Sequence, residues 1–276
     1  MTIKYNQSLI KSKPYKITDL QNTYQDLIES GKKIINCTIG DPIGDTPKIV
    51  RSRFKQNIKR NSQYPIYTGI DELKSAIKNS LNNNYKINLK EDMIISCNGT
   101  KEAIYSIPDL FDWSNNEQIC IPSLSYPIYE ISANYKKILT YSMPIQLSNN
   151  YLPNLDDIPK KILSKTQLFW INSPHNPTTT IAPKEYMNEL VKLAEKYNFI
   201  ICSDECYNDL YYTKKPTSIL EFDSENWVCF RSLSKRSHMT GYRSGAIITK
   251  NKLLLKNLKK LRSPMGIGTP TPIQHA

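Results

Sequence analysis

The stretch TQLFWINSPHNPTTTIAPKEYMNELVKLAEKYNFIICSDE, residues 166–205, decides the fold. It begins with a short apolar run, 166–173, and ends with another, 198–205. Between these runs, residues 184–198 carry apolar side chains at helical spacing. These side chains are Met187, Leu190, Val191 and Ala194. A strand, an amphipathic helix and a second apolar strand are typical of parallel strands covered on both faces.

The same alternation continues on both sides of this stretch. The sequence predicts further strands at 93–97, 117–122, 227–234 and 245–250. It predicts further helices at 15–31, 71–81, 101–111, 126–135 and 251–262. One more short strand is expected at 33–42, before the alternation begins. We therefore predict an α/β fold with a mostly parallel central sheet and helices on both faces, preceded by a separate N-terminal region, 1–48.

Composition favours a globular chain and leaves the positive charge to be explained. The chain has 276 residues, of which 39% are hydrophobic and 22% charged, with a net charge of +12. A basic chain can bind nucleic acid, but the lysines are scattered and no nucleic-acid motif is present. We therefore expect a solvated lysine-rich surface and no nucleic-acid partner. No apolar run reaches membrane-spanning length and no signal core is present, so we expect a cytoplasmic protein without a membrane partner.

The six cysteines do not predict a metal site. Several stand inside apolar runs, where cysteine behaves as a small hydrophobic residue. Only Cys202 and Cys206 are close in sequence, and no second Cys or His pair completes a zinc ligand set. We expect no bound metal.

Polar clusters follow four of the predicted strands, where ligands bind in parallel sheets. They are Asn98–Lys101, the SPHNPT run at 173–178, Ser203–Glu205 and the SLSKRSHMTGYRSG run at 232–245. Each cluster by itself has two interpretations. The turn at Gly99 is either a phosphate site at a helix N-terminus or a simple helix cap. Asp204 either pairs with a cationic ligand or forms a cap or structural ion pair.

The last cluster contains the most reactive groups. Lys235 is either a Schiff-base nucleophile, whose pKa desolvation and neighbouring cations would lower, or an exposed loop lysine. The planar guanidinium of Arg243 suits phosphate oxygens.

Together, these clusters match one known set of motifs. The motifs are IGDPIGDTP, YTGIDELKSAI, CNGTKEAI, IPSLSYPIY, NSPHNPT, SDECYNDLYY and SLSKRSHMTGYRSG. The chain resembles the fold type I, class I and II aminotransferases that use pyridoxal 5'-phosphate, from about residue 15 to its last residue. The resemblance implies that 1–48 forms an N-terminal arm and part of a small domain, and that 49–276 forms the large cofactor-binding domain.

The resemblance also implies roles for individual residues. Lys235 is similar to the lysine that forms the Schiff base and moves the substrate proton. Asp204 is similar to the carboxylate that pairs with the pyridinium nitrogen. Tyr207 and Asn176 match the groups that bond the ring's phenolic oxygen, and Tyr126 matches the aromatic residue stacked on the ring.

The same resemblance implies a phosphate site and a second subunit. The phosphate site would consist of Gly99, Thr100, Lys101, Ser232, Ser234 and Arg243. Tyr64 matches a tyrosine that reaches the phosphate in the neighbouring subunit, which implies a homodimer. Gly40 matches the glycine whose backbone contacts the substrate carboxylate.

Two features depart from the family pattern. Thr179 stands where the family usually has a glycine, so the turn after Asn176 could have another backbone conformation. The chain stops at GTPTPIQHA, before the segment that carries the family's carboxylate-binding arginine. We therefore expect a C-terminally incomplete chain in which cofactor binding is retained and efficient turnover is in doubt.

The expected reaction moves an amino group between an amino acid, with glutamate as donor, and a 2-oxo acid. The motifs most resemble N-succinyldiaminopimelate aminotransferases, which implies a step of lysine biosynthesis with 2-oxoglutarate. Aspartate- or alanine-type enzymes, another chemistry of the same fold such as a β-lyase or decarboxylase, and a non-catalytic cofactor-binding relative remain alternatives.

Overall fold

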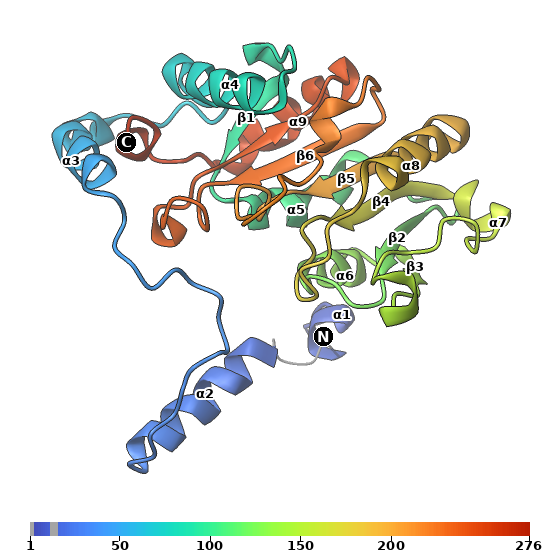
Figure 1. The fold of residues 1–276 in the computed structure, drawn as a ribbon, viewed down its shortest axis with the longest axis horizontal. Coiled ribbons are helices and arrows are strands. Elements are labelled where there is room, and N and C mark those ends of the chain that lie inside the picture. Colours follow the sequence, from blue (N-terminus) through green and yellow to red (C-terminus); the bar gives the residue numbers. More distant parts are fainter. Residues whose placement is uncertain (1–2, 12–15) are drawn as a thin grey trace. The chain divides into compact units, whose positions relative to one another are not determined.

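Seven strands form one sheet in the order β1-β7-β6-β5-β4-β2-β3 in the computed structural model, which describes residues 3–11 and 16–276 (Figure 1). The strands are β1 (Ile94–Cys97), β2 (Gln118–Pro122), β3 (Leu139–Met143), β4 (Thr166–Asn172), β5 (Ile200–Asp204), β6 (Trp227–Ser232) and β7 (Gly245–Ile248). β7 pairs antiparallel with both of its neighbours, and every other pair is parallel. The prediction of a mostly parallel sheet is confirmed.

The helices of this part of the chain lie before, between and after these strands in the sequence. They are α3 (Lys48–Asn57), α4 (Asp71–Tyr85), α5 (Thr100–Ser106), α6 (Ile128–Tyr135), α7 (Lys160–Leu163), α8 (Lys184–Tyr197), α9 (Lys252–Met265) and α10 (Thr271–Gln274). Short 3-10 turns occur at Ile58–Ser62, Glu91–Met93, Ile107–Leu110, Leu147–Asn149, Ile219–Glu221 and Thr240–Tyr242. The predicted amphipathic face of α8 is confirmed, since the four apolar residues predicted for that face are all buried.

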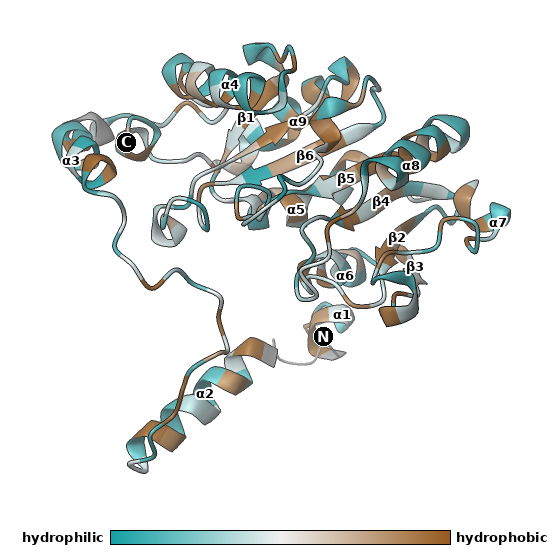
Figure 2. Cartoon of the chain, viewed as in Figure 1, coloured by the Kyte–Doolittle hydropathy of each residue, from teal (hydrophilic) through white to brown (hydrophobic). Residues whose placement is uncertain are grey.

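Each face of the sheet is covered by its own helices (Figure 1). On one face, α4 and α8 pack against alternate strand residues, among them Phe169, Ile201 and Cys229. On the other face lie α5, α6 and α9, with Tyr129 of α6 stacked on Trp170 of β4. We call these the α4/α8 face and the α5/α6 face. The strands are apolar and the outer helix surfaces polar, as expected for a sheet buried on both sides (Figure 2).

Two strand predictions differ from the structure. β3 is absent from the predicted elements because most of its residues are exposed, and it is recognised through its pairing with β2. The strand predicted at 33–42 is wrong, since the structure has no strand there. This segment has no partner strand among the described residues, and Ile35 is 89% exposed, so neither pairing nor burial stabilises an extended ladder.

The chain divides into two compact units, 1–44 and 45–276. The first contains α1 (Gln7–Lys11) and α2 (Lys16–Glu29), and α2 confirms the described part of the helix predicted at 15–31. The second contains the sheet and the remaining helices. The assignment of 1–48 and 49–276 to domains of the family stays a prediction.

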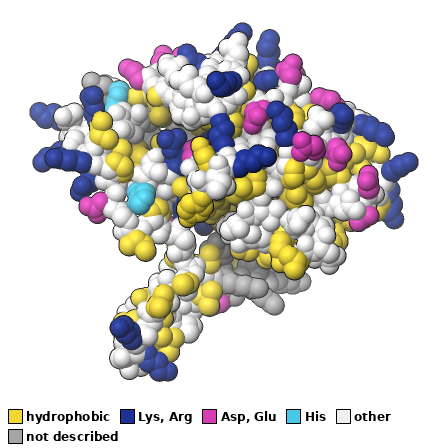
Figure 3. All heavy atoms as spheres, viewed as in Figure 1, with side chains coloured by type: hydrophobic (Ala, Val, Ile, Leu, Met, Phe, Trp, Pro, Cys, Tyr) yellow, Lys and Arg dark blue, Asp and Glu magenta, His cyan; other side chains and the backbone are white. Residues whose placement is uncertain are grey.

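Lysine and arginine side chains are spread over the visible surface and do not gather in one patch (Figure 3). Within the described ranges, no helix combines the length and the apolar composition needed to cross a bilayer. The same residues contain no cluster of three or more His, Cys, Asp or Glu side chains that could hold a metal ion.

Candidate active site

Asp204 ends β5 as a buried carboxylate on the α5/α6 face. Its Oδ2 accepts a 2.6 Å hydrogen bond from the Tyr129 hydroxyl, and its Oδ1 accepts one of 3.3 Å from the backbone N–H of Cys206. Burial raises the pKa of Asp204, because the charged form is poorly solvated there. No cationic side chain among the described residues forms an ion pair with this carboxylate. A positively charged ligand would therefore be stabilised beside it.

Tyr129 is a site residue to which the motifs gave no role, although it is the last residue of IPSLSYPIY. Its ring is buried and stacks on Trp170, with the ring centroids 4.2 Å apart and the planes within 8°. Tyr126, which is half-buried, meets Tyr129 edge-on at 5.8 Å. Tyr126 lies just before α6, whose N-cap is Pro127, and Tyr129 lies in the first turn of that helix. Its position three residues after Tyr126 is the signal in the sequence that could have identified Tyr129.

The loop after β4 brings Asn176 to Tyr207. The Asn176 amide donates to the Tyr207 hydroxyl at 3.4 Å. Asn172 connects this loop to Asp204: its Oδ1 accepts from the Asn176 N–H at 2.7 Å, and its Nδ2 donates to the Asp204 carbonyl at 2.8 Å. The structure therefore places Asn176, Tyr207 and Asp204 at one edge of the sheet.

His175 joins this loop to the loop that carries Tyr126. Its Nε2 donates to the Leu124 carbonyl at 3.0 Å, and this leaves Nδ1, in the neutral ring, to accept from the Thr178 hydroxyl at 2.7 Å. The side chain is buried, and burial lowers the pKa of His175. His175 thus stabilises two loops that each hold a predicted cofactor residue.

Thr179 shows what replaces the expected glycine in this loop. Its φ is +64°, so a β-branched residue occupies the left-handed region that glycine adopts without strain. Its N–H donates to the His175 carbonyl at 2.7 Å, which holds the turn in this conformation. The turn therefore keeps the backbone conformation that a glycine would adopt, although Thr179 occupies the position, and this costs strain energy.

Gly99 and Arg243 form a second part of the site, at the start of α5. Gly99 has φ +78°, and a Cβ atom there would lie 2.2 Å from Nη2 of Arg243. Glycine is therefore needed here both for its backbone conformation and for the close approach of the guanidinium. Nη1 of Arg243 donates to the Thr240 carbonyl at 2.9 Å. A pocket of about 400 Å³ lies beside Arg243 and Lys101.

The segment after β6 carries the remaining predicted groups. Ser232 and Ser234 are buried, and the Ser232 hydroxyl accepts from the Ser234 N–H at 3.1 Å. Lys235 is half-buried in the turn that follows. Thr100 lies next to the β5 end, with its hydroxyl 3.1 Å from the Cys206 sulfur.

Two predicted residues remain to be located. Tyr64 is fully exposed in the segment before α4. Gly40 lies in an exposed segment of the first unit, and its part in the site stays a prediction.

The residues of the second unit fit pyridoxal 5'-phosphate on three observations. The buried Asp204 carboxylate has no cationic partner among the described residues, which suits a protonated ring nitrogen. Gly99 and the Arg243 guanidinium provide a backbone turn and a planar cation for phosphate. The Asn176 amide and the Tyr207 hydroxyl lie together, as a phenolic oxygen would require.

Comparison with known proteins agrees with this fit. A family model described as aminotransferase class I and II matches residues 32–276. The LL-diaminopimelate aminotransferase of Aquifex aeolicus is 34% identical over 269 residues, which cover 95% of this chain and 69% of that protein.

Solved structures with more than a quarter of their residues identical show the same fold. The aspartate aminotransferase of Thermotoga maritima matches with a TM-score of 0.90 and 28% identity, covering 98% of this chain and 72% of that one. The aminotransferase AspB of Helicobacter pylori matches with a TM-score of 0.87 and 31% identity, covering 96% and 72%. The chain therefore belongs to the class I and II aminotransferases and is a transaminase that uses pyridoxal 5'-phosphate.

Proposed function

We propose that this transaminase moves an amino group between an LL-diaminopimelate-type amino acid and a 2-oxo acid such as 2-oxoglutarate, with glutamate as the donor in the reverse direction. Support comes from the relatives in Aquifex aeolicus and Natranaerobius thermophilus, both named LL-diaminopimelate aminotransferase and 34% and 33% identical. Their names favour the free diamino acid over its N-succinyl form, which the motifs alone suggested. A place in amino-acid biosynthesis, in a cytoplasmic homodimer, is part of this proposal.

The observation that carries the proposed site is the pairing of Asp204 with Tyr129. A buried carboxylate held at 2.6 Å by a neutral donor stays available to a cationic ring nitrogen. Tyr126 would restrict the tilt of the ring, while Asn176 and Tyr207 would hold its phenolic oxygen. When bound, pyridoxal phosphate supplies an aldehyde carbon and a ring that accepts electrons.

The phosphate would lie between the start of α5 and the segment after β6. Arg243 is the cation there, with Gly99 at its guanidinium. We assign the other contacts to Thr100, Lys101, Ser232 and Ser234. Lys235 would hold the cofactor covalently and then, as a free amine, take the proton from the substrate α-carbon and return it to the cofactor. Tyr64, fully exposed in this chain, is assigned to the partner's phosphate, and Gly40 to the substrate carboxylate.

The substrate assignment is tested by kcat/KM with 2-oxoglutarate and a series of amino donors. LL-diaminopimelate should exceed N-succinyl-LL-diaminopimelate, aspartate and alanine. Aspartate is the second candidate, because the Thermotoga maritima structure at 28% identity is an aspartate aminotransferase. A higher value for aspartate or for the N-succinyl form would contradict the proposal, and oxo-acid analysis would reveal a lyase or decarboxylase.

The site assignment is tested by absorption spectroscopy of the cofactor. Wild type should give a visible band that shifts when a true donor is added, and Lys235→Ala should abolish the band. The loss of general acid and base catalysis in that variant should lower the rate by about 10²- to 10⁴-fold. A band in wild type that no donor shifts would support the non-catalytic alternative.

A further inference from the structure

Two arginines flank the segment that carries Lys235. Arg231 directly precedes Ser232 and Arg236 directly follows Lys235. Both reach the loop that begins directly after Asp204, the last residue of β5, and that carries Tyr207. The segment therefore has a cationic attachment at each end.

The first attachment is buried on the α4/α8 face. Nε of Arg231 lies 3.4 Å from Oε2 of Glu205, and both side chains are almost fully buried. The Arg231 guanidinium also lies over the Tyr85 ring, 5.0 Å from its centroid. Asn208 links the same groups, because its amide donates to Oε2 of Glu205 at 3.0 Å and to the Tyr85 hydroxyl at 3.1 Å. The Arg231 nitrogens accordingly interact with Glu205 as an ion pair, without a hydrogen bond to any described residue.

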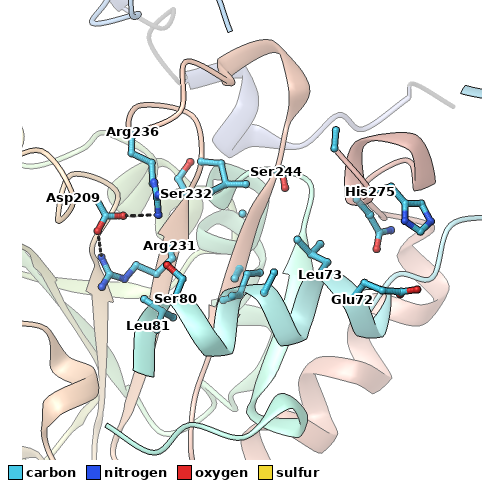
Figure 4. A pocket seen from close by; sticks show the side chains of 17 residues that line it. Glu72, Leu73, Ser80, Leu81, Asp209, Arg231, Ser232, Arg236, Ser244 and His275 are labelled. Atoms are coloured by element: carbon cyan, nitrogen blue, oxygen red, sulfur yellow. Dashed lines mark hydrogen bonds and ion pairs between the residues drawn. The ribbon is translucent and has the colours of Figure 1, made fainter. Parts of the chain in front are cut away.

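The second attachment is nearer the surface. Nη1 of Arg236 lies 3.3 Å from Oδ2 of Asp209, and the Oδ1 of the same carboxylate lies 4.0 Å from Nη1 of Arg231. Figure 4 shows both guanidinium groups directed at Asp209. One carboxylate thus bridges the two arginines on either side of Ser232–Lys235.

We propose that Glu205 and Asp209, acting through Arg231 and Arg236, hold the Ser232–Lys235 segment against the loop of Asp204 and Tyr207, and are positioning residues for Lys235. This proposal rests on the proposed function for the role of Lys235. The attachments fix the distance between two strand ends that must contact the same cofactor from different sides. A lysine on a turn needs such support, since reactive groups must be held close to their working geometry.

The backbone of the segment shows what the attachments would stabilise. The Leu233 N–H donates to the Ser244 carbonyl, and the Met239 N–H donates to the Ser234 carbonyl. These are turn contacts outside any helix or strand, so local opening is easier here than in the sheet. Loss of a flanking ion pair should therefore appear first as faster opening of residues 233–239.

Asp209→Asn is the best test, because its side chain is 26% exposed and the protein should tolerate the change. Loss of Glu205 or Arg231 would instead leave a charge buried and destabilise the whole fold. Asp223→Asn is the matched control, since it removes a surface ion pair with Lys250 at 2.9 Å, away from the segment. Asp209→Glu keeps the charge and should restore wild-type behaviour.

Two measurements are made on the 276-residue chain. In the cofactor-free protein, hydrogen exchange of peptides covering 233–239 should be about two- to fivefold faster in Asp209→Asn, as expected for an ion pair of this exposure. In the cofactor-loaded protein, the dissociation constant of pyridoxal phosphate, with attachment at Lys235 confirmed by borohydride reduction and mass spectrometry, should rise by a similar factor. Arg236→Gln should reproduce both effects, and the double variant should add little.

The proposal is overturned if Asp209→Asn behaves like Asp223→Asn in both measurements. It is also overturned if exchange changes but cofactor affinity does not, because the attachment would then be merely structural. A wild-type chain that binds no pyridoxal phosphate would contradict the proposed function instead. In that case, the exchange comparison alone still decides whether Asp209 holds the segment.

Discussion

Asp204 and Glu205 are adjacent, both are buried, and their side chains lie on opposite faces of the sheet. Glu205 is saturated with partners on the α4/α8 face. It accepts hydrogen bonds from Ser203 at 3.0 Å, Asn208 at 3.0 Å, Ser218 at 2.6 Å and the Ile219 N–H at 2.7 Å, with Arg231 beside it. Asp204 has two donors, and no cationic partner among the described residues.

This difference separates a structural carboxylate from a functional one. A buried charge is tolerated when protein groups satisfy it, as they do for Glu205. A buried charge that has too few protein partners is stabilised by a ligand that supplies the missing positive charge. We infer that Asp204 is such a carboxylate. The number and charge of the partners, more than the burial, therefore distinguish the two carboxylates.

The largest expected effect is on stability, and it comes from removing the Glu205 carboxylate. Glu205→Ala should lower the free energy of unfolding of the cofactor-free protein by about 3–5 kcal/mol, because Arg231 stays buried without its nearer and fully buried charged partner. Asp204→Asn should change the same quantity by only about 1 kcal/mol, since burial already disfavours its charge. Urea unfolding of both variants measures this contrast.

The affinity for pyridoxal phosphate should show the reverse order of effects for the two carboxylates. Asp204→Asn should weaken binding of pyridoxal phosphate strongly, while a folded Glu205→Gln should weaken it only by the roughly two- to fivefold expected of a residue that positions Lys235. If Asp204→Asn instead unfolds the protein and leaves cofactor affinity intact, the division into structural and functional carboxylates is wrong.

Tyr129→Phe sharpens the comparison at Asp204. The variant keeps the stack on Trp170 and removes a 2.6 Å hydrogen bond to a charged group, worth about 1.5–3 kcal/mol. The pKa of Asp204 should rise further, and the affinity for pyridoxal phosphate should fall by about tenfold or more. A spectroscopic titration of cofactor binding against pH measures both. The same change at Tyr186, whose hydroxyl donates to the Pro153 carbonyl, should leave cofactor affinity unchanged.

His175 extends the comparison to a buried base. Burial holds its pKa in the folded protein below the ordinary value of 6.5, so the unfolded chain binds the proton more readily. The stability that neutral His175 contributes is therefore present above about pH 6.5 and is lost as the pH falls toward its folded-state pKa. Urea unfolding of wild type between pH 8 and 5 should show this loss, and His175→Gln, which keeps a donor for Leu124, should reduce it. Identical pH profiles for the two proteins would contradict it.

The smallest effect is expected at Thr179. Glycine at this position removes about 1–2 kcal/mol of strain from the left-handed backbone conformation. It also raises the conformational entropy of the unfolded chain, which lowers stability by about 0.4–1 kcal/mol. Thr179→Gly should therefore stabilise the protein by about 0.5 kcal/mol in urea unfolding. Thr213→Gly is the control, because this exposed loop threonine does not have a positive φ and should gain nothing. Equal effects at the two sites would mean that the turn is not strained.

Local patterns in the sequence were sufficient for most of the fold. The apolar periodicity of α8 and the short apolar runs of β4, β5 and β6 predict these elements correctly. The reason is that their buried positions must be apolar, so the sequence pattern follows the burial pattern. β3 escaped prediction because an exposed edge strand lacks that selection. The segment 33–42 was wrongly predicted because its apolar residues imitate a strand that has no pairing partner among the described residues.

For the site, the sequence by itself determined which chemical groups follow each strand, including Asp204, Lys235 and Arg243. Only the tertiary structure decided their partners: Tyr129 reaches Asp204 across 75 positions of sequence, and Gly99 lies against Arg243. It also separated Asp204 from Glu205, two neighbouring carboxylates that composition cannot distinguish. The reason is physical, because the ionisation and availability of a buried group depend on the donors and charges around it, and folding brings these from distant parts of the chain.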